Sequence, residues 1–258
     1  MIGERSLRPA IAQRVLRAVA LSSLMLFSTT GCARQGNDMS DRQTFGNPTH
    51  APLADAVRKG DAKLARELVA GGANPNASDE KGMPLLQWAM LRDDRDAFRL
   101  LLDLRADPAQ GNRSGQTAMH LAAMAKSRYW LETLLERGVS PDLPNTVTGA
   151  PPLFDALRAQ SQDNIDRLLD AGARLDTRDR SGTTPLHQAA LVNNLAAVRR
   201  FLDAGADPRA TDRNGATFDA FLFDGDESTL NASAKRDLEA IRARLRSSGI
   251  EPARSGTH

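Results

Sequence analysis

Apolar positions recur along this chain with a period of about 33 residues. One equivalent position in each unit is separated from the next by 33, 33, 34, 33 and 33 residues: Leu53, Leu86, Met119, Leu153, Leu186 and Asp219. A second marker, the small residue that closes each unit, recurs every 33, 33, 34 and 33 residues: Ala73, Ala106, Val139, Ala173 and Ala206. Both markers place the longer interval in the same unit, which locates a one-residue insertion near residues 145–148. Tandem units of this length predict a stacked repeat architecture.

The pattern inside each unit predicts a helical hairpin. In the unit at residues 179–211, Thr184 suits a helix N-cap. Pro185 suits the first helical turn, because the backbone N–H that proline lacks would have no hydrogen-bond partner there. The Ala-Ala pair that follows leaves room for a neighbouring helix. Further along, Val198, Phe201 and Leu202 give a second helix an apolar stripe.

The unit at residues 179–211 resembles the ankyrin repeat. Gly182 and the stretch Thr184–His187 match its turn and first-helix start, and Gly205–Asp207 matches its closing loop. The other units vary this pattern: the second has Pro84 where a capping threonine is usual, the fourth lacks the histidine, and the first and last are incomplete. The resemblance implies an all-α ankyrin-repeat solenoid of about five full repeats plus a partial sixth, over residues 49–223.

A C-terminal helix is expected to close the stack. Its apolar positions recur at spacings of three and four residues: Leu230, Ala234, Leu238, Ile241 and Leu245. Charged residues fill the opposite side, as a terminal seal requires, which predicts a capping helix and tail over residues 224–258. A membrane-surface helix is the weaker alternative because acidic residues interrupt the basic side.

The N-terminal segment has the features of an export signal. Arginines precede an apolar run from Ala18 to Phe27, which is too short to span a bilayer but fits the hydrophobic segment of a signal peptide. Gly31-Cys32 resembles the lipobox of bacterial lipoproteins, although Thr29 replaces the usual leucine. This predicts a signal peptide at residues 1–31, then a lipidated Cys32 and a flexible tether over residues 32–48. An ordinary signal peptide with an unmodified cysteine is the alternative.

This resemblance implies a periplasmic, lipid-anchored protein. Ala33 follows the cysteine where aspartate would act as an inner-membrane retention signal in enteric bacteria, so the outer membrane is favoured. Cys32 is the only cysteine, which excludes a disulfide within the chain. Loss of residues 1–31, with four arginines and one glutamate, would change the formal net charge from +2 to −1. A nucleic-acid partner is therefore disfavoured.

Candidate chemistry along the chain is sparse. His120 and His187 stand where the ankyrin resemblance implies a structural imidazole that bonds across the hairpin backbone, and His50 and His258 lie near the ends of the repeat region and the chain. Residues 224–227 lack the ligand spacing of a calcium loop and are interpreted as a solvated turn. No catalytic residue, metal ligand, cofactor or small-molecule substrate is expected.

The ankyrin resemblance implies that hairpin tips and the far end of each first helix face a concave groove. Apolar residues at these positions predict a contact surface for a protein partner: Met83, Leu91, Met124, Val147, Leu191 and Val192. A charged rim is expected around them: Glu80, Lys81, Arg92, Arg113, Arg158, Arg180 and Arg213. The alternative is that Met124 and Leu191 pack sideways against neighbouring repeats. Five larger residues are assigned to the core: Trp88, Phe98, Trp130, Ile165 and Phe201.

Together these features predict a lipid-anchored envelope protein that binds another protein through its groove. In its concrete form, the chain resembles ankyrin-type immunity proteins encoded beside secreted antibacterial toxins, including lipases delivered by type VI secretion. A scaffold or chaperone for a resident envelope enzyme is the competing hypothesis. A hydrolase is the least supported class.

Overall fold

The computed structural model describes residues 51–222 and 227–251, all within the compact unit Met39–His258. These residues form helices and two isolated β-bridges, without a strand, so the predicted all-α class is confirmed. The predicted signal peptide, Cys32, the tether and the turn residues Asp224–Asp226 lie outside the described residues.

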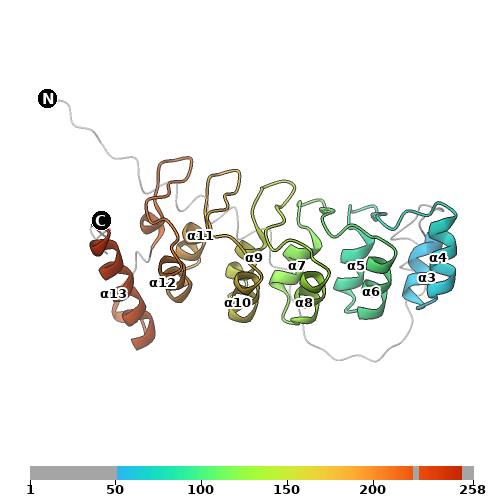
Figure 1. The fold of residues 1–258 in the computed structure, drawn as a ribbon, viewed down its shortest axis with the longest axis horizontal. Helices are drawn as coiled ribbons and strands as arrows, with labels where there is room; N and C mark the ends of the chain where they lie inside the picture. Colours follow the sequence, from blue (N-terminus) through green and yellow to red (C-terminus); the bar gives the residue numbers. More distant parts are fainter. Residues whose placement is uncertain (1–50, 223–226, 252–258) are drawn as a thin grey trace. The chain divides into compact units, whose positions relative to one another are not determined.

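Five helix pairs follow one another in chain order among the described residues (Figure 1). Their bounds are α3 Ala51–Arg58 with α4 Ala62–Ala70, α5 Leu85–Leu91 with α6 Arg95–Asp103, α7 Ala118–Met124 with α8 Tyr129–Glu136, α9 Pro152–Arg158 with α10 Gln162–Asp170, and α11 Pro185–Leu191 with α12 Leu195–Asp203. The partial sixth repeat is the short turn η1 at Phe218–Phe221. A second short turn, η2 at Glu227–Thr229, leads to α13 at Ala232–Ser247.

Helix starts follow from the local sequence. Thr184 caps α11 and forms a capping box with His187, and Thr117 does the same for α7 with His120. In the second repeat Pro84 occupies the N-cap, and no side-chain hydrogen bond caps the helix. Most second helices are capped at their N-terminus by a side-chain oxygen. In α6, for example, Asp94 Oδ1 accepts the backbone N–H of Ala97 at 3.0 Å.

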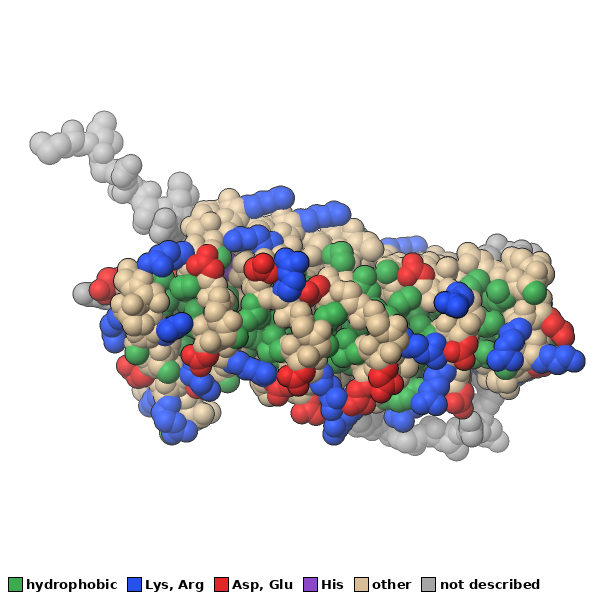
Figure 2. Space-filling model, viewed as in Figure 1, with side chains coloured by type: hydrophobic (Ala, Val, Ile, Leu, Met, Phe, Trp, Pro, Cys, Tyr) green, Lys and Arg blue, Asp and Glu red, His purple; other side chains and the backbone are tan. Residues whose placement is uncertain are grey.

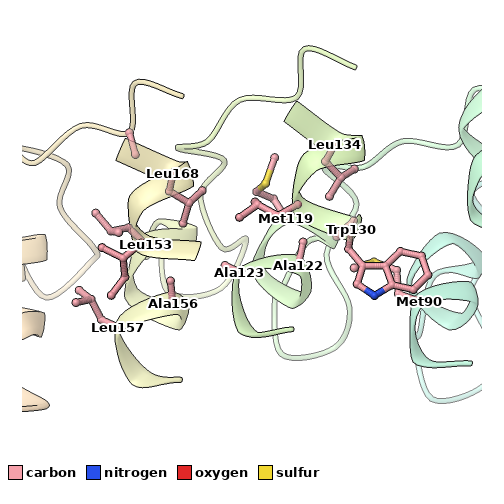
Figure 3. Packing of buried hydrophobic residues seen from close by; sticks show 14 of the residues in the cluster. Met90, Met119, Ala122, Ala123, Trp130, Leu134, Leu153, Ala156, Leu157 and Leu168 are labelled. Atoms are coloured by element: carbon pink, nitrogen blue, oxygen red, sulfur yellow. The ribbon is translucent and has the colours of Figure 1, made fainter. Parts of the chain in front are cut away.

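Small side chains set how closely neighbouring repeats approach. Figure 3 shows Ala122 and Ala123 of α7 beside Ala156 of α9, and all three alanines are fully buried. The first helices of successive repeats contact one another in order, α5 with α7, α7 with α9, and α9 with α11. Alanine at these positions removes the volume that would otherwise hold the helices apart.

The aromatic core joins one repeat to the next. Phe98 of α6 meets Trp130 of α8 edge to face, with the ring centroids 5.1 Å apart. Trp88, Ile165 and Phe201 are buried as well, so all five residues assigned to the core are confirmed. Each repeat therefore depends on its neighbour to bury its large side chains.

The last helix seals the stack. Leu238, Ile241 and Leu245 of α13 are buried, and α13 packs against α12. An ion pair between Arg199 Nε and Asp237 Oδ1 at 2.8 Å joins the two helices at the surface. The predicted capping helix is thus confirmed, with Leu230 and Ala234 partly buried at its start.

Counted from residues 78–84, the third hairpin (residues 145–151) contains the inserted residue and lies against the second hairpin (residues 111–117). Asn145 is buried, and its Oδ1 accepts the backbone N–H groups of Val147 and Thr148 at 2.9 Å each. Its Nδ2 donates to the carbonyl oxygen of Ser114 at 3.2 Å. A Cβ atom on the adjoining Gly115 would lie 2.5 Å from the backbone nitrogen of Val147 and would contact Asn145 Oδ1 more closely still. A side chain at position 115 would therefore require the backbone near Asn145 and Val147 to shift.

We expect Gly115→Ala to destabilise the protein more than Gly215→Ala. Both glycines have positive φ, +78° and +77°, but nothing lies within 4 Å of a Cβ on Gly215. Each alanine lowers the free energy of unfolding by about 1–2 kcal/mol because of its positive φ. Overpacking lowers it by a further amount of about 1–3 kcal/mol in the Gly115→Ala variant and not in the Gly215→Ala variant. Urea unfolding of the two variants measures the difference. Equal losses would show that the third hairpin moves away from the second without cost.

Candidate partner-binding surface

The first helices end on a row of side chains that share one register. Leu91, Met124, Arg158 and Leu191 are the last residues of α5, α7, α9 and α11, and Arg58 ends α3 in the same way. Each lies five residues after the marker position of its repeat. We call these five residues the helix-end row. Helical stacking repeats this position once per repeat, so the row runs along the stack.

Three members of the helix-end row are apolar and exposed. The exposed fractions are 60% for Leu91, 45% for Met124 and 44% for Leu191. Val147, at the tip of the third hairpin, is 50% exposed. Of the exposed large hydrophobic side chains in the described part, only Leu64 lies elsewhere. The sideways packing considered for Met124 and Leu191 is therefore wrong, while their binding of a partner stays a prediction.

Met83 and Val192 differ from the prediction that they are exposed. Both side chains are half-buried and pack against the hydrophobic core. The backbone N–H of Met83 donates to Asp79 Oδ1 at 2.7 Å, which closes the hairpin turn. Val192 is the C-cap of α11, where the chain turns back toward α12. Neither residue is among the exposed large hydrophobic side chains of the described part.

The arginines of the predicted rim also serve the fold. Arg113 Nη2 donates to the carbonyl oxygen of Glu80 at 3.2 Å, and Arg180 Nη2 donates to that of Thr146 at 3.1 Å. Each bond joins one hairpin to the preceding one. Both residues therefore help to hold neighbouring hairpins together, while their side chains remain exposed.

Arg178 belongs with these arginines, although the predicted rim omits it. Its Nη1 donates to the carbonyl oxygen of Thr211 at 2.7 Å and to that of Gly182 at 3.0 Å. The sequence signal that could have revealed this contact is the spacing, because Arg178 and Thr211 lie one repeat apart.

The remaining rim residues have varied surroundings. The guanidinium of Arg92 lies over the Trp88 ring, 5.0 Å from its centroid. Arg158 Nη1 pairs with Asp155 Oδ1 at 2.9 Å. Burial raises the pKa of Asp155, while Arg158 and then His120 oppose that rise. The other three rim residues are exposed: Glu80, Lys81 and Arg213.

The two repeat histidines bond across the hairpin backbone. His120 Nδ1 accepts the backbone N–H of Thr117 at 3.2 Å, so Nε2 carries the proton and donates to the carbonyl oxygen of Ala150 at 2.9 Å. His187 repeats this pattern with Ala216, at 3.1 Å. Burial lowers the pKa of both imidazoles, opposed by these backbone hydrogen bonds. The structural role implied by the resemblance accounts for both side chains.

Other kinds of site find little support in residues 51–222 and 227–251. This part of the chain holds no group of three or more histidine, cysteine or acidic side chains that could share a metal ion. None of its helices combines the length and apolar character that crossing a membrane requires. The surface best defined by geometry is therefore the helix-end row with the hairpins beside it.

These features define a stacked helical-repeat protein with an exposed contact surface. Family models described as ankyrin repeats match residues 53–145, as three copies, and residues 168–217, as many copies. Protein PhlB of Serratia liquefaciens is 36% identical over 178 residues, which cover 67% of this chain and 77% of that protein. The chain belongs to the ankyrin-repeat family, which is generally a protein–protein interaction module.

Solved structures agree with this assignment. The ankyrin repeat domain of Bcl-3, a member of the IkappaB protein family, is 28% identical with a TM-score of 0.60, covering 74% of this chain and 81% of that one. The ankyrin repeat protein EF0377 is 22% identical with a TM-score of 0.56, covering 76% of this chain and 96% of that one. At this identity the second similarity shows the fold alone.

We expect His120→Gln with His187→Gln to make stability less dependent on pH. Because the folded pKa of each histidine lies below 6.5, the unfolded chain binds protons first as pH falls, and stability declines from about pH 6.5 downward. The decline is at most about 1.4 kcal/mol per pH unit for each histidine. Glutamine occupies the equivalent position in the second repeat, where Gln87 Nε2 donates to the carbonyl oxygens of Gln110 and Gln116 at 3.0 and 2.7 Å, while its Oε1 is buried without a hydrogen-bond partner among the described residues.

Urea unfolding at pH 7.5 and pH 5.5 measures this effect. The difference in unfolding free energy between the two pH values should be smaller in the double variant than in the wild type. Asp155 titrates in the opposite sense, and because His120 lowers its pKa, loss of His120 changes that titration and contributes to the difference measured in the double variant. An unchanged difference would mean that the two imidazoles take up protons in the folded state as readily as in the unfolded chain.

Proposed function

We propose that the protein binds a partner protein through the helix-end row and the neighbouring hairpin tips. The observation that carries this proposal is the shared register of Leu91, Met124 and Leu191, which leaves three large apolar side chains exposed along one line. A solvated surface has no reason to repeat apolar residues at one structural position, whereas a protein interface gains from burying them. Methionine adds a side chain that adapts to a partner's shape.

The proposed location is the periplasm, with attachment to the outer membrane through a lipid on Cys32. The basic start, the short apolar run and Gly31-Cys32 support this part of the proposal. Each buried acyl methylene contributes about 0.8 kcal/mol, and stable anchoring needs more than one chain. The segment from Ala33 to Pro48 would act as the tether, with a root-mean-square reach of roughly 20–24 Å for a flexible chain.

The concrete form of the proposal is an immunity protein that neutralises a secreted antibacterial toxin, such as a lipase delivered by type VI secretion. It rests on the resemblance of an exported ankyrin-repeat chain to such immunity proteins. A rigid surface on a membrane tether would meet a toxin as it enters the periplasm. The helix-end row would then block the toxin by burying its own apolar residues against it.

We expect Leu91→Gln, Met124→Gln and Leu191→Gln together to abolish partner binding without unfolding the protein. Glutamine keeps the length of the side chain and suits a helix, so the unfolding free energy should change by less than about 1 kcal/mol. Leu64→Gln is the matched control, because Leu64 is 43% exposed on α4, outside the helix-end row.

The measurement has two parts. Cells that express a toxin encoded beside this gene should survive with the wild type or the Leu64→Gln control, and die with the triple variant. Titration calorimetry with an inactive form of the toxin should show the same order, with at least a hundredfold weaker binding for the triple variant. Protection by the triple variant would refute the assigned surface, and indifference of cells lacking the protein to every neighbouring toxin would refute the immunity role.

We expect Cys32→Ser to release the protein from membranes. Serine offers no sulfur for lipid attachment, and the short apolar run cannot hold the chain in a bilayer by itself. Fractionation of cells into soluble and membrane material, followed by immunoblotting, measures the shift. Ser40→Ala, in the tether, is the control and should stay with the membrane. A serine variant that stays membrane-bound would contradict the anchor.

A further inference from the structure

Charge is distributed unevenly over the hairpins beside the helix-end row. We define the hairpin edge as the four hairpins at residues 111–117, 145–151, 178–184 and 211–217. These segments contain four arginines and two aspartates: Arg113, Arg178, Arg180, Arg213, Asp179 and Asp212. The hairpin edge therefore has a formal charge of +2, equal to that of the whole chain.

The two aspartates of the hairpin edge point inward. Asp179 Oδ1 accepts the backbone N–H groups of Ser181 and Thr183 at 2.8 and 2.9 Å. Asp212 Oδ1 accepts those of its own hairpin in the same way, at 2.8 and 3.0 Å. In the second hairpin the uncharged Asn112 fills this position. The carboxylates are thus occupied in forming the turns and are only partly exposed.

The four arginines are exposed, and three of them are positioned by neutral groups. Arg113, Arg178 and Arg180 each donate to a backbone carbonyl oxygen of an adjacent hairpin, at 3.2, 2.7 and 3.1 Å. A guanidinium has five N–H donors, so one or two such bonds leave others for a partner. A carbonyl oxygen also leaves the positive charge uncompensated. These contacts hold the guanidiniums in place between the hairpin tips.

Arginines of the second helices have partners other than backbone carbonyl oxygens. Three arginines there pair with carboxylates of the preceding repeat, Arg137 with Asp103, Arg167 with Glu132, and Arg200 with Asp166. Arg95 and Arg99 of α6 lie instead over the Tyr129 ring. Figure 2 shows this contrast on one face of the molecule, with Lys and Arg along the upper edge, where the hairpins of Figure 1 lie, and mixed charges along the lower edge. The hairpin edge thus carries a surplus of positive charge, and exposed apolar residues lie at the ends of the first helices that follow its hairpins.

We propose that the hairpin edge recognises carboxylates, so that the partner presents an acidic protein surface whose apolar residues cover the helix-end row. This inference rests on the proposed function and adds the chemistry of the partner. Guanidiniums bind carboxylates through paired hydrogen bonds, and prior positioning by the hairpins lowers the entropy lost on binding. An acidic rim around an apolar contact would also exclude basic proteins by charge repulsion.

The observations favour a protein over a nucleic acid. A nucleic acid would need cations that follow its phosphates, whereas Asp179 and Asp212 lie among the arginines of the hairpin edge, and Glu80 lies beside Lys81 on the preceding hairpin. Leu91, Met124 and Leu191 would also have no use against a phosphate backbone. Carboxylates beside leucine or phenylalanine side chains match both parts of the surface.

The test measures binding of the full chain to four labelled probes by fluorescence anisotropy. The probes are a 21-residue helical peptide of leucine and glutamate, the same peptide with lysine for glutamate, the same peptide with serine for leucine, and a 21-nucleotide single-stranded DNA. We expect the leucine–glutamate peptide to bind at least tenfold more tightly than each of the others, and its affinity to fall as salt is raised. Equal affinity for the lysine peptide, or equal or tighter binding of the DNA, would overturn the proposal.

Charge variants locate the effect. Arg113→Gln, Arg180→Gln and Arg213→Gln together should weaken binding of the leucine–glutamate peptide at least tenfold. Arg66→Gln, Arg236→Gln and Arg246→Gln remove the same charge from exposed positions on α4 and α13 and should leave binding unchanged. Thermal unfolding checks that both proteins fold. As a second variant, Lys81→Glu with Arg213→Glu should weaken binding of the leucine–glutamate peptide and strengthen binding of the lysine peptide.

Failure of this inference can be told apart from failure of the proposed function. If the charge variants protect cells and bind the toxin as the wild type does, while the triple glutamine variant of the helix-end row does not, the row is a binding surface and the carboxylate preference is wrong. If the row variant also binds the toxin and protects cells normally, the proposed function itself is wrong.

Discussion

The lateral contact between repeats is the constraint on which the other features depend. A single pair of short helices cannot bury its apolar faces alone, and the alanines of the first helices let the next pair approach closely enough to cover them. Hydrogen bonds from Gln87, His120 and His187 to the backbone of the following hairpin reinforce this packing. Packed side chains and directional hydrogen bonds therefore both stabilise the contact between neighbouring repeats.

This constraint also determines which residues are available to a partner. Positions that face a neighbouring repeat must be small or apolar, and hairpin positions that form the turn must accept or donate to backbone groups. The last residue of each first helix neither packs into a neighbouring repeat nor forms the hairpin turn. Arginine in the first and fourth repeats and leucine or methionine in the others occupy it without changing the fold. Its composition is therefore set by something other than packing.

Periodicity predicts the core well because stacking requires the same contact in every repeat, so residues such as Phe98 and Phe201 are recognised by position alone. It also predicts the exposure of Leu91, Met124, Val147 and Leu191. It fails for Met83 and Val192, which pack against the core. Val192 lies one residue after the exposed Leu191, and a repeat pattern does not resolve a difference of one residue.

The arginine contacts lie beyond such a pattern for a different reason. A long side chain can reach several acceptors, and the sequence names the donor without naming the acceptor. The acceptor decides the consequence. A carboxylate holds an arginine and cancels its charge, as between the second helices, whereas a backbone carbonyl holds it and leaves the charge exposed. The hairpins can therefore be stiffened by the same residues that keep them positively charged. Side-chain order and electrostatic attraction, which usually compete on a protein surface, are combined here beside an exposed apolar row.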